Sequence, residues 1–311
     1  MRCEESGSNV SIAASISVII PSYNSASVLT AAIESVASQS YSVDEIIVVD
    51  DGSVDDTRKV CGRSDKRVRY VRQANAGAST ARNTGAANAR GQWLAFLDAD
   101  DVWLPDKLEC QLSALSQHPE AAFCITRAEV WSPGRQCYEG MGWDGSLDPV
   151  EMVRNLLVRN IFTGLCSSLL IRRDAFEAVG GFAAGKACED RRIAIELLQR
   201  YQGVIVDLPL VRQQSGPAHW TDPQRHRAEM LLLINDYDQH YKMLDLSGRL
   251  HRKTLARVDE RTGMHYLENG DVKAAARYLR SAVWHWPWIK NPWRFLINAS
   301  LGRLRVAEAP P

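Results

Sequence analysis

At residues 93–101 the chain reads WLAFLDADD, and this stretch decides the fold that we expect. Its first five residues form a continuous apolar run, and three carboxylates follow within four positions. A strand that is apolar on both faces is typical of a parallel sheet covered by helices on each side. In open α/β sheets, ligands bind at the carboxyl ends of the strands. The stretch therefore predicts an α/β fold with a polar site at residues 98–101.

Further apolar runs flank this strand and alternate with helix-like segments. The order β-α-β-α predicts a doubly wound domain whose mostly parallel sheet is flanked by helices. Upstream we expect strands at 17–21, 45–50 and 68–72 and helices at 28–38, 55–62 and 78–89. Downstream we expect a helix at 105–117, strands at 121–126 and 167–172, a helix at 190–200, and a Gly-, Trp- and Pro-rich loop at 131–149.

Strand patterns end near residue 220, and the remainder of the chain has a helical pattern. We expect a flexible segment at residues 1–15, the α/β domain at 16–218 and an all-helical region at 219–311. In that region Gly270-Asp271 precedes an apolar stripe. Together with the helix before it, this stripe resembles a single tetratricopeptide-type hairpin, and one copy is too few for a free-standing solenoid.

The composition excludes several classes of protein. Lys plus Arg equals Asp plus Glu, 37 each, so no bulk charge indicates a nucleic-acid partner and any basic surface must be local. The seven cysteines are scattered without a C-x-x-C pair, which favours reduced thiols. Residues 1–15 lack the features of a signal peptide, and no apolar run is long enough to cross a bilayer. We expect a cytoplasmic protein, either soluble or attached to the inner face of a membrane from one side.

The carboxylates that follow the strand repel one another unless a cation or hydrogen-bond donors neutralise them. Hard oxygen ligands suit Mg²⁺ or Mn²⁺, which take one or two carboxylates together with substrate phosphates. The alternative is structural: Asp101 caps the helix that is entered through Pro105, and Asp98 and Asp100 are solvated.

Three other polar groups fall at comparable positions. Asp50-Asp51-Gly52-Ser53 ends the second strand, and a carboxylate there can accept a base N–H or a ribose hydroxyl. Arg82 can reach back to the carboxylate edge, or it can be an ordinary arginine on a solvated helix face. Glu189-Asp190 begins a helix, where a carboxylate can serve as a general base or complement the helix dipole.

Taken together, these segments resemble family 2 glycosyltransferases of the GT-A fold, across about residues 16 to 215. Each motif is weakly specific, but the ordered set is strongly so. The resemblance rests on Ser17–Asn24, Asp50–Ser53 with Asp55 and Thr57, Ala81–Gly85, Phe96–Asp101, Gly180–Phe182 and Glu189-Asp190.

The resemblance implies an inverting transfer of a sugar from a nucleoside-diphosphate sugar, with a UDP-sugar as the first choice, to a hydroxyl of a saccharide or lipid-linked saccharide. Asp190, beside Glu189, would be the catalytic base. Asp100 would bind Mn²⁺ or Mg²⁺ on the diphosphate, and Asp98 would contact the ribose or a metal-bound water. The nucleotide-sugar pocket would be formed by Pro21, Ser22, Tyr23, Asn24, Asp51, Arg82, Asp98 and Gly181.

One departure from the family pattern concerns the metal. Family members often carry Arg-x-His after the strand that follows the Glu-Asp helix, but Gln214 stands at the His position here. His219, five residues later, is a candidate third ligand. The missing His keeps open a catalytically silent scaffold, which would bind no metal with nucleotide. A sugar-nucleotide pyrophosphorylase would need a Gly-rich basic loop after the first strand, and residues 21–24 contain neither glycine nor a cation.

Four tryptophans lie close together at residues 284–293, interleaved with cations. Such a segment can lie at a membrane interface and give peripheral contact. Alternatively its aromatic rings close the helical hairpin, because a tryptophan buries a large area in a core.

Overall fold

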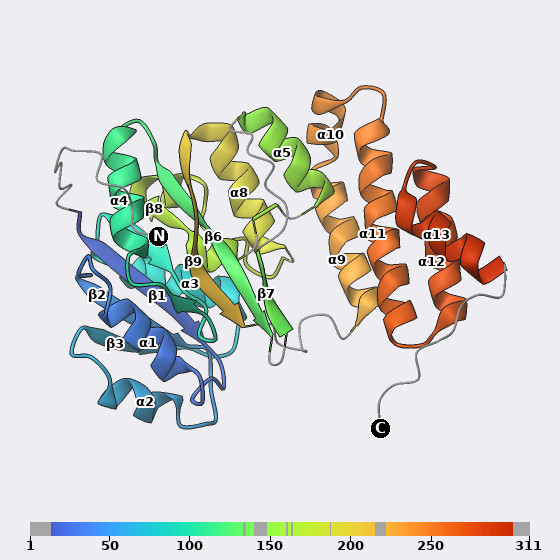
Figure 1. Ribbon diagram of the computed structural model, residues 1–311. Helices are drawn as coiled ribbons and strands as arrows, with labels where there is room; N and C mark the ends of the chain where they lie inside the picture. Colours follow the sequence, from blue (N-terminus) through green and yellow to red (C-terminus); the bar gives the residue numbers. More distant parts are fainter. Residues whose placement is uncertain are drawn as a thin grey trace. The chain divides into compact units, whose positions relative to one another are not determined.

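The computed structural model describes residues 14–132, 135–139, 148–159, 161–162, 164–186, 188–214 and 222–300. The chain divides into two compact units (Figure 1). The first consists of residues 1–149 and 161–216, and the second of residues 150–160 and 217–311. Each unit is described separately below.

The first unit is built on one sheet whose strands lie in the order β3-β2-β1-β4-β8-β6-β9-β5, with β7 paired to β6. β3, β2, β1 and β4 are all parallel, whereas β8 is antiparallel to both β4 and β6. The strands are β1 Ile16–Ser22, β2 Glu45–Asp50, β3 Val68–Arg72, β4 Trp93–Phe96, β5 Val102–Trp103, β6 Phe123–Ser132, β7 Arg135–Glu139, β8 Leu170–Arg172 and β9 Gly203–Gln214. The expected α/β fold with a mostly parallel sheet flanked by helices is confirmed.

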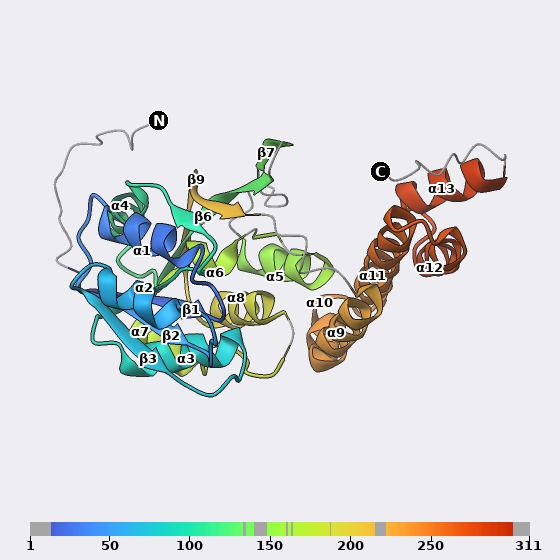
Figure 2. The same cartoon turned by 90° about the horizontal axis from the view of Figure 1, so that it is seen from below.

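Helices cover both faces of this sheet (Figure 2). Val18 and Ile20 of β1 belong to a core cluster with residues of α1 and α4. Ile19 points to the other face, where a Cβ on Gly85 of α3 would lie 2.3 Å from its Cγ2. Gly85 therefore lets α3 approach the sheet closely. The helices of this unit are α1 Leu29–Ala37, α2 Thr57–Arg63, α3 Ala78–Asn88, α4 Lys107–Gln117, α6 Leu165–Ser168, α7 Arg173–Ala178 and α8 Glu189–Arg200.

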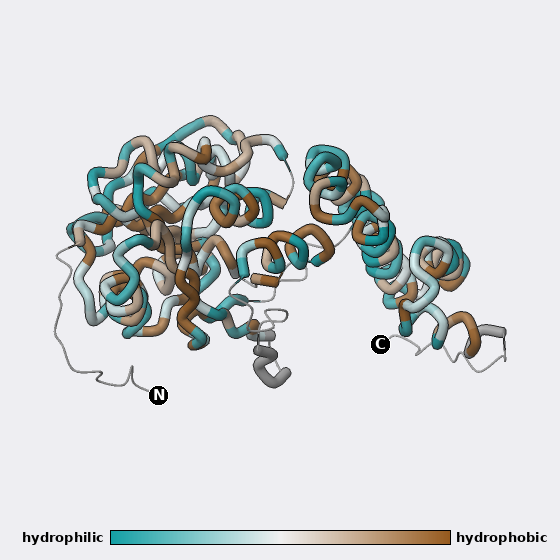
Figure 3. The backbone as a smooth tube through the Cα atoms, turned by 90° about the horizontal axis from the view of Figure 1, so that it is seen from above, coloured by the Kyte–Doolittle hydropathy of each residue, from teal (hydrophilic) through white to brown (hydrophobic). Residues whose placement is uncertain are grey.

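Buried apolar strands explain why the sheet forms. All seven residues of β1 and all six of β2 are buried. Figure 3 colours the chain by the hydropathy of each residue, and hydrophobic segments lie in the interior of this unit. Removal of such apolar surface from water is the main favourable contribution to folding.

Three sequence-based expectations need correction. The segment 131–149 is not all loop, because β6 runs to Ser132 and pairs with β7 in a hairpin. The strand expected at 167–172 is shorter, because Ser167 and Ser168 end the helix α6 and only residues 170–172 are strand. Cys61, Cys124, Cys166 and Cys188 are free thiols, but Cys110 is disulfide-bonded, so the expectation of reduced thiols fails at that position.

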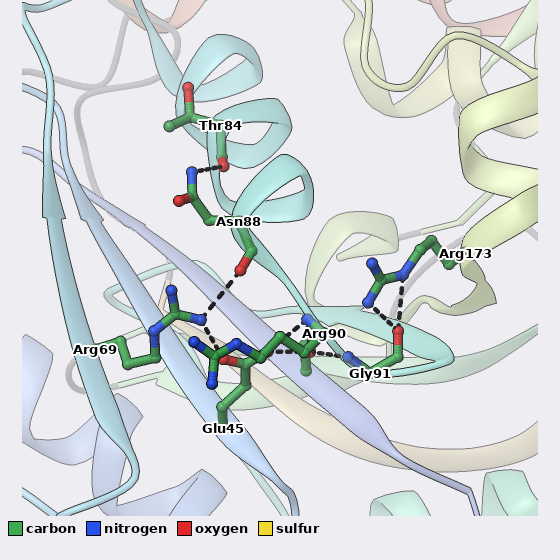
Figure 4. Close-up of polar contacts among 8 residues, drawn as sticks. Glu45, Arg69, Thr84, Asn88, Arg90, Gly91 and Arg173 are labelled. Atoms are coloured by element: carbon green, nitrogen blue, oxygen red, sulfur yellow. Dashed lines mark hydrogen bonds and ion pairs between the residues drawn. The ribbon is translucent and has the colours of Figure 1, made fainter.

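Glu45 ties together the edge of the sheet at which the parallel strands begin (Figure 4). Its carboxylate accepts hydrogen bonds from the Ser17 hydroxyl at 2.8 Å and the backbone N–H of Arg90 at 2.6 Å, and it pairs with Arg69. Burial opposes the charge of Glu45, but its donors hold the pKa of this carboxyl below its usual value. This edge is therefore consolidated by its own polar network.

The second unit consists of helices in the described residues, which confirms the expected helical extension. α11 and α12 pack closely, because a Cβ on Gly263 would lie 2.7 Å from Cγ of Leu279. The Asp271 carboxylate accepts a hydrogen bond from the Ala274 N–H at 2.9 Å and so caps α12. Tyr241 of α10 donates to the Leu157 carbonyl of α5 at 2.8 Å. The helices are α5 Pro149–Val158, α9 Pro223–Asp236, α10 Asp238–Leu244, α11 Arg249–Glu268, α12 Val272–His285 and α13 Lys290–Ser300.

A search of the described residues for helices of membrane-spanning length and hydropathy finds none.

Lys107, at the start of α4, generates a prediction about stability and pH. Its ammonium group is fully buried, donates to Gln111 Oε1 at 2.8 Å and lies 4.0 Å from the ring centroid of Trp103. Burial lowers the pKa of Lys107 to about 7. The unfolded chain keeps this proton up to about pH 10. Between these values the unfolded state binds more protons, so stability rises as the pH rises.

We expect Lys107→Met to remove this rise, which amounts to at most about 1.4 kcal/mol per pH unit. Urea unfolding at a series of pH values above neutrality measures it. The matched control is Lys59→Met, since Lys59 lies at the surface with a side chain that is 68% exposed. An unchanged pH slope in Lys107→Met would show that the buried lysine stays charged.

Candidate active site

The loops after β1 and β2 are joined at the carboxyl ends of their strands. The backbone N–H of Asp51 donates to the Ser22 carbonyl at 2.8 Å. The backbone N–H of Asn24 donates to the Ser53 hydroxyl oxygen at 2.9 Å, and Asn24 Oδ1 accepts from the Val54 N–H at 2.9 Å. Asn24 adopts a φ of 51°, a conformation that asparagine tolerates better than most residues. The two loops therefore form one connected rim.

Among the expected nucleotide-side residues, burial separates two groups. Pro21 and Ser22 are buried, whereas the Tyr23 side chain is 52% exposed. Asp51 is buried, and its carboxylate accepts from Gln73 Nε2 at 2.7 Å and from the N–H groups of Ala76 and Gly77 at 2.9 and 2.8 Å. Asp51 thus holds the loop that leads into α3.

Arg82 of α3 lies between two carboxylates from distant parts of the chain. Its Nη2 lies 2.5 Å from Asp98 Oδ1, after β4, and its Nη1 lies 3.3 Å from Glu189 Oε1, at the start of α8. The Arg82 side chain is only 5% exposed, so the interpretation as a solvated surface arginine is wrong. Burial opposes its charge, but Asp98 and Glu189 hold the pKa of Arg82 above its usual range. The guanidinium therefore remains charged and joins three elements.

The ring of Phe182 packs against the guanidinium group of Arg82. The guanidinium carbon lies 5.2 Å from the Phe182 centroid, and this ring packs edge-on against Phe96 at 5.0 Å. The Nε of Arg82 is buried and has no hydrogen-bond partner among the described residues. The arrangement thus leaves one donor of a buried cation unused within the described part of the chain.

The three carboxylates of residues 98–101 lie in different environments. Asp98 is partly exposed and faces Arg82, while Asp100 is exposed. Asp101 is buried, and its Oδ2 accepts from the Ser167 hydroxyl at 2.5 Å. Burial, and then the nearby charges of Asp98 and Asp100, raise the pKa of Asp101 well above its usual range.

The expected capping role of Asp101 is wrong. The residue before α4 is Asp106, and Asp101 instead holds Ser167 while it accepts a hydrogen bond from the Gln214 backbone. Asp101 therefore links the end of β4 to α6 and to the end of β9. A cap was predicted because sequence spacing cannot show which distant donors a side chain meets.

The sequence did not reveal the structural role of Asn83. Its Nδ2 donates to the Phe182 carbonyl at 2.8 Å, and its Oδ1 accepts from the Phe182 N–H at 2.9 Å. At Gly181 φ is +68°, and a Cβ would lie 2.7 Å from the Asn83 Oδ1. A glycine is therefore required where the Gly-Gly-Phe turn meets α3. The sequence offered one signal for this role, because Asn83 directly follows Arg82 in the Ala81–Gly85 motif.

The start of α8 carries both Glu189 and Asp190. Cys188 before them has a φ of 58°, which turns the chain sharply into the helix. Glu189 faces Arg82, whereas Asp190 is partly exposed and accepts from the Arg191 N–H at 2.7 Å. The structure thus brings Glu189 to the site through Arg82.

Among the described residues, carboxylates are the side chains at this site that could bind a metal ion. No group of three or more His, Cys, Asp or Glu side chains able to hold an ion occurs within the described residues. His219 lies outside those residues, and Gln214 is the last described residue of β9. Asp98 and Asp100 offer hard oxygen atoms, which fits Mg²⁺ or Mn²⁺ completed by phosphate and water. The residues present therefore suit an ion that arrives with a phosphate ligand.

The central ion pairs generate a prediction about stability. Arg82→Met leaves Asp98 and Glu189 without their cation, so we expect the free energy of unfolding to fall by about 3 kcal/mol. Urea unfolding at neutral pH measures this loss. Arg90→Met is the matched control, because Arg90 is exposed and we expect a change within about 0.5 kcal/mol. Equal stability of the two variants would contradict the assigned role of Arg82.

Comparison with known proteins identifies relatives of this chain. The sequence profile described as "Glycosyl transferase family 2" matches residues 17–180. The Escherichia coli protein WfgD, a UDP-Glc:alpha-D-GlcNAc-diphosphoundecaprenol beta-1,3-glucosyltransferase, is 45% identical over 102 residues, which cover 32% of this chain and 40% of that protein. The matched segments cover 16% to 62% of the curated relatives' own lengths.

Two solved structures resemble the fold. S. aureus TarS 1-349 in complex with UDP-GlcNAc gives a TM-score of 0.58 at 15% identity, covering 87% of this chain and 91% of that one. The mannosyltransferase PcManGT from Pyrobaculum calidifontis, in complex with GDP-Man and Mn²⁺, gives 0.59 at 17% identity, covering 93% and 80%. The family match spans more than half of the sequence and the fold agrees with it, so the chain belongs to glycosyl transferase family 2 and has the GT-A fold.

Proposed function

We propose that this glycosyltransferase moves a sugar, with inversion at the anomeric carbon, from a nucleoside-diphosphate sugar to a hydroxyl of a saccharide or lipid-linked saccharide. We assign the reaction to the α/β domain at residues 16–218. The observation that carries the proposal is Arg82, which joins Asp98 to Glu189 although these residues are 91 positions apart in the sequence. This contact brings the carboxylate run and the start of α8 to one place, beside the joined rim of β1 and β2.

The rim and α3 supply the donor side of the site. The exposed ring of Tyr23 is available for stacking on a base, and the buried Asp51 fixes the loop 73–77 beside it. Asp98 remains partly exposed, so it can accept a hydrogen bond from a ribose hydroxyl while it pairs with Arg82. In this assignment Pro21, Ser22, Asn24 and Gly181 shape the backbone around the nucleotide sugar.

Asp190 supplies the base. It lies next to Glu189, whose contact with Arg82 fixes the start of α8 relative to the carboxylate run. The acceptor hydroxyl gives its proton to the Asp190 carboxylate as its oxygen bonds to the anomeric carbon, and the bond to the nucleoside diphosphate breaks on the opposite face. One such displacement inverts the anomeric carbon, as in one-step glycoside hydrolysis. An α-linked donor then yields a β-linked product.

Asp100 is the residue we assign to a divalent cation, with Asp98 beside it. When bound, Mn²⁺ or Mg²⁺ neutralises the negative charge of the departing diphosphate. Asp100 suits this role because it is exposed, whereas Asp101 is buried and accepts a hydrogen bond from Ser167. The presence of Mn²⁺ in the PcManGT complex supports the choice of ion.

Two proteins similar to this chain support the choice of substrates to test. The name of WfgD gives UDP-Glc as donor, a diphosphoundecaprenol-linked sugar as acceptor and a β-linked product. TarS is solved with UDP-GlcNAc. We therefore propose a UDP-sugar as the first donor to test and a lipid-linked saccharide as an acceptor class.

A donor panel tests the proposal as a whole. The intact protein is incubated with UDP-, GDP- and dTDP-sugars, with and without Mn²⁺ or Mg²⁺, and release of the nucleoside diphosphate is followed. We expect metal-dependent hydrolysis of at least one donor. Calorimetry with the nucleoside diphosphates serves as a second readout. No metal-dependent binding and no hydrolysis across the panel would leave a catalytically silent scaffold instead.

Asp100→Asn tests the cation assignment. We expect donor hydrolysis to fall by about a hundredfold or more, since about 3 kcal/mol of charge stabilisation is lost. Asp106→Asn is the matched control, because Asp106 is an exposed carboxylate six residues later that caps nothing with its side chain. Unchanged metal-dependent hydrolysis by Asp100→Asn would show that the ion is held elsewhere.

Asp190→Asn tests the base. We expect transfer to an acceptor to fall by about 10²- to 10⁴-fold, the usual contribution of a general base, while the affinity for nucleoside diphosphate stays the same. Glu196→Gln on the same helix, where the carboxylate pairs with Arg200, is the control. Transfer by Asp190→Asn at nearly the wild-type rate would place the base on another residue, and Glu189→Gln would then be measured.

A further inference from the structure

The α12–α13 segment concentrates positive charge in a chain that is neutral overall. Residues 272–300 contain five cations and no Asp or Glu, namely Lys273, Arg277, Arg280, Lys290 and Arg294, whereas the whole chain has 37 of each sign. In the described part of the chain, Lys273, Arg277 and Arg280 form no ion pair with a carboxylate. A basic surface is therefore present, and it is local, as expected for a chain of neutral composition.

These cations lie on the exposed face of α12. Lys273, Arg277, Arg280 and Trp284 follow one another at spacings of four, three and four residues, which places them on one side of a helix. The side turned toward the core carries Ala275, Leu279 and Ala282, all 0% exposed. The same three cations also line an open pocket of about 540 Å³ together with Tyr266, Tyr278 and one carboxylate residue, Asp271, so cations outnumber carboxylates there.

Exposed tryptophans follow these cations in the sequence, one near the end of α12 and two after it. Trp284 is 84% exposed, Trp288 76% and Trp293 44%. Exposure on this scale rules out Trp284 and Trp288 as rings that close the hairpin, whereas Trp286 packs against the core cluster of Ala256, Ala282 and Ile289. The Trp293 indole N–H donates to the Pro287 carbonyl at 2.6 Å, which fixes the start of α13 against the turn before it. The rings are thus presented by a folded segment.

We propose that this segment docks on the surface of a bilayer that contains anionic lipids. The Trp–cation surface consists of Arg280, Trp284, Trp288, Lys290, Trp293 and Arg294. Indole rings prefer the headgroup level of a membrane, and each nearby Lys or Arg gains from the negative potential of anionic lipids. The pocket lined by Lys273 and Arg277 offers room and positive charge for a lipid phosphate. Charge complementarity favours the anionic bilayer, because residues 272–300 carry five cations and no carboxylate side chain.

Vesicle flotation of the intact protein tests the proposal. We expect co-flotation with vesicles of phosphatidylcholine plus phosphatidylglycerol, weaker binding to phosphatidylcholine alone, and release by high salt. Arg280→Gln with Lys290→Gln and Arg294→Gln should lower the partition coefficient about a hundredfold, given the contribution of each cation near such a surface. The control removes three exposed cations from α11 of the same unit, Arg249→Gln with Arg252→Gln and Lys253→Gln.

A second pair of variants tests the aromatic part. Trp284→Ser with Trp288→Ser should weaken binding at least tenfold, whereas Met243→Ser with Leu246→Ser should not, although those side chains are 82% and 94% exposed. The proposal is overturned if the protein floats with neither kind of vesicle. It is also overturned if, in either pair, the variant and its control bind equally well. Self-association through the tryptophans, seen by analytical ultracentrifugation, in a protein that leaves vesicles unbound overturns it too. Donor hydrolysis, measured in parallel, reports on the first unit alone, so the two proposals fail separately.

Discussion

The charge of Arg82 is the constraint on which the candidate site depends. A guanidinium cannot lose its proton at any ordinary pH, so its burial is tolerable only where carboxylates stand beside it. Asp98 and Glu189 fulfil this condition, and they come from the end of β4 and the start of α8. One electrostatic requirement therefore fixes three elements together. The Phe182 ring beneath Arg82 and the clamp of Asn83 on that residue's backbone belong to the same arrangement.

The run of carboxylates after β4 shows how one short sequence serves three purposes. Asp98 faces a cation, Asp100 faces solvent, and Asp101 is buried against Ser167. Mutual repulsion within the run is reduced because Arg82 takes up one charge and the raised pKa of Asp101 favours its neutral form. This separation leaves Asp100 as the carboxylate best placed for a ligand from solution.

The candidate site and residues 272–300 concentrate charge of opposite sign. The candidate site gathers carboxylates at the ends of parallel strands, whereas residues 272–300 carry only cations. The whole chain carries 37 residues of each sign, so bulk composition conceals both features. Local charge, and the burial of each group, carry the functional information.

The sequence alone determined the fold class, the order of strands and helices from β1 to β4, and the family. Buried parallel strands read as apolar runs, and the motifs lie within a few residues of strand and helix ends, where local chemistry decides them. It could not determine the partners of Arg82 and Asp101, the clamp formed by Asn83, or the exposure of Trp284 and Trp288. Those depend on contacts between segments up to about a hundred residues apart, which only the tertiary structure creates.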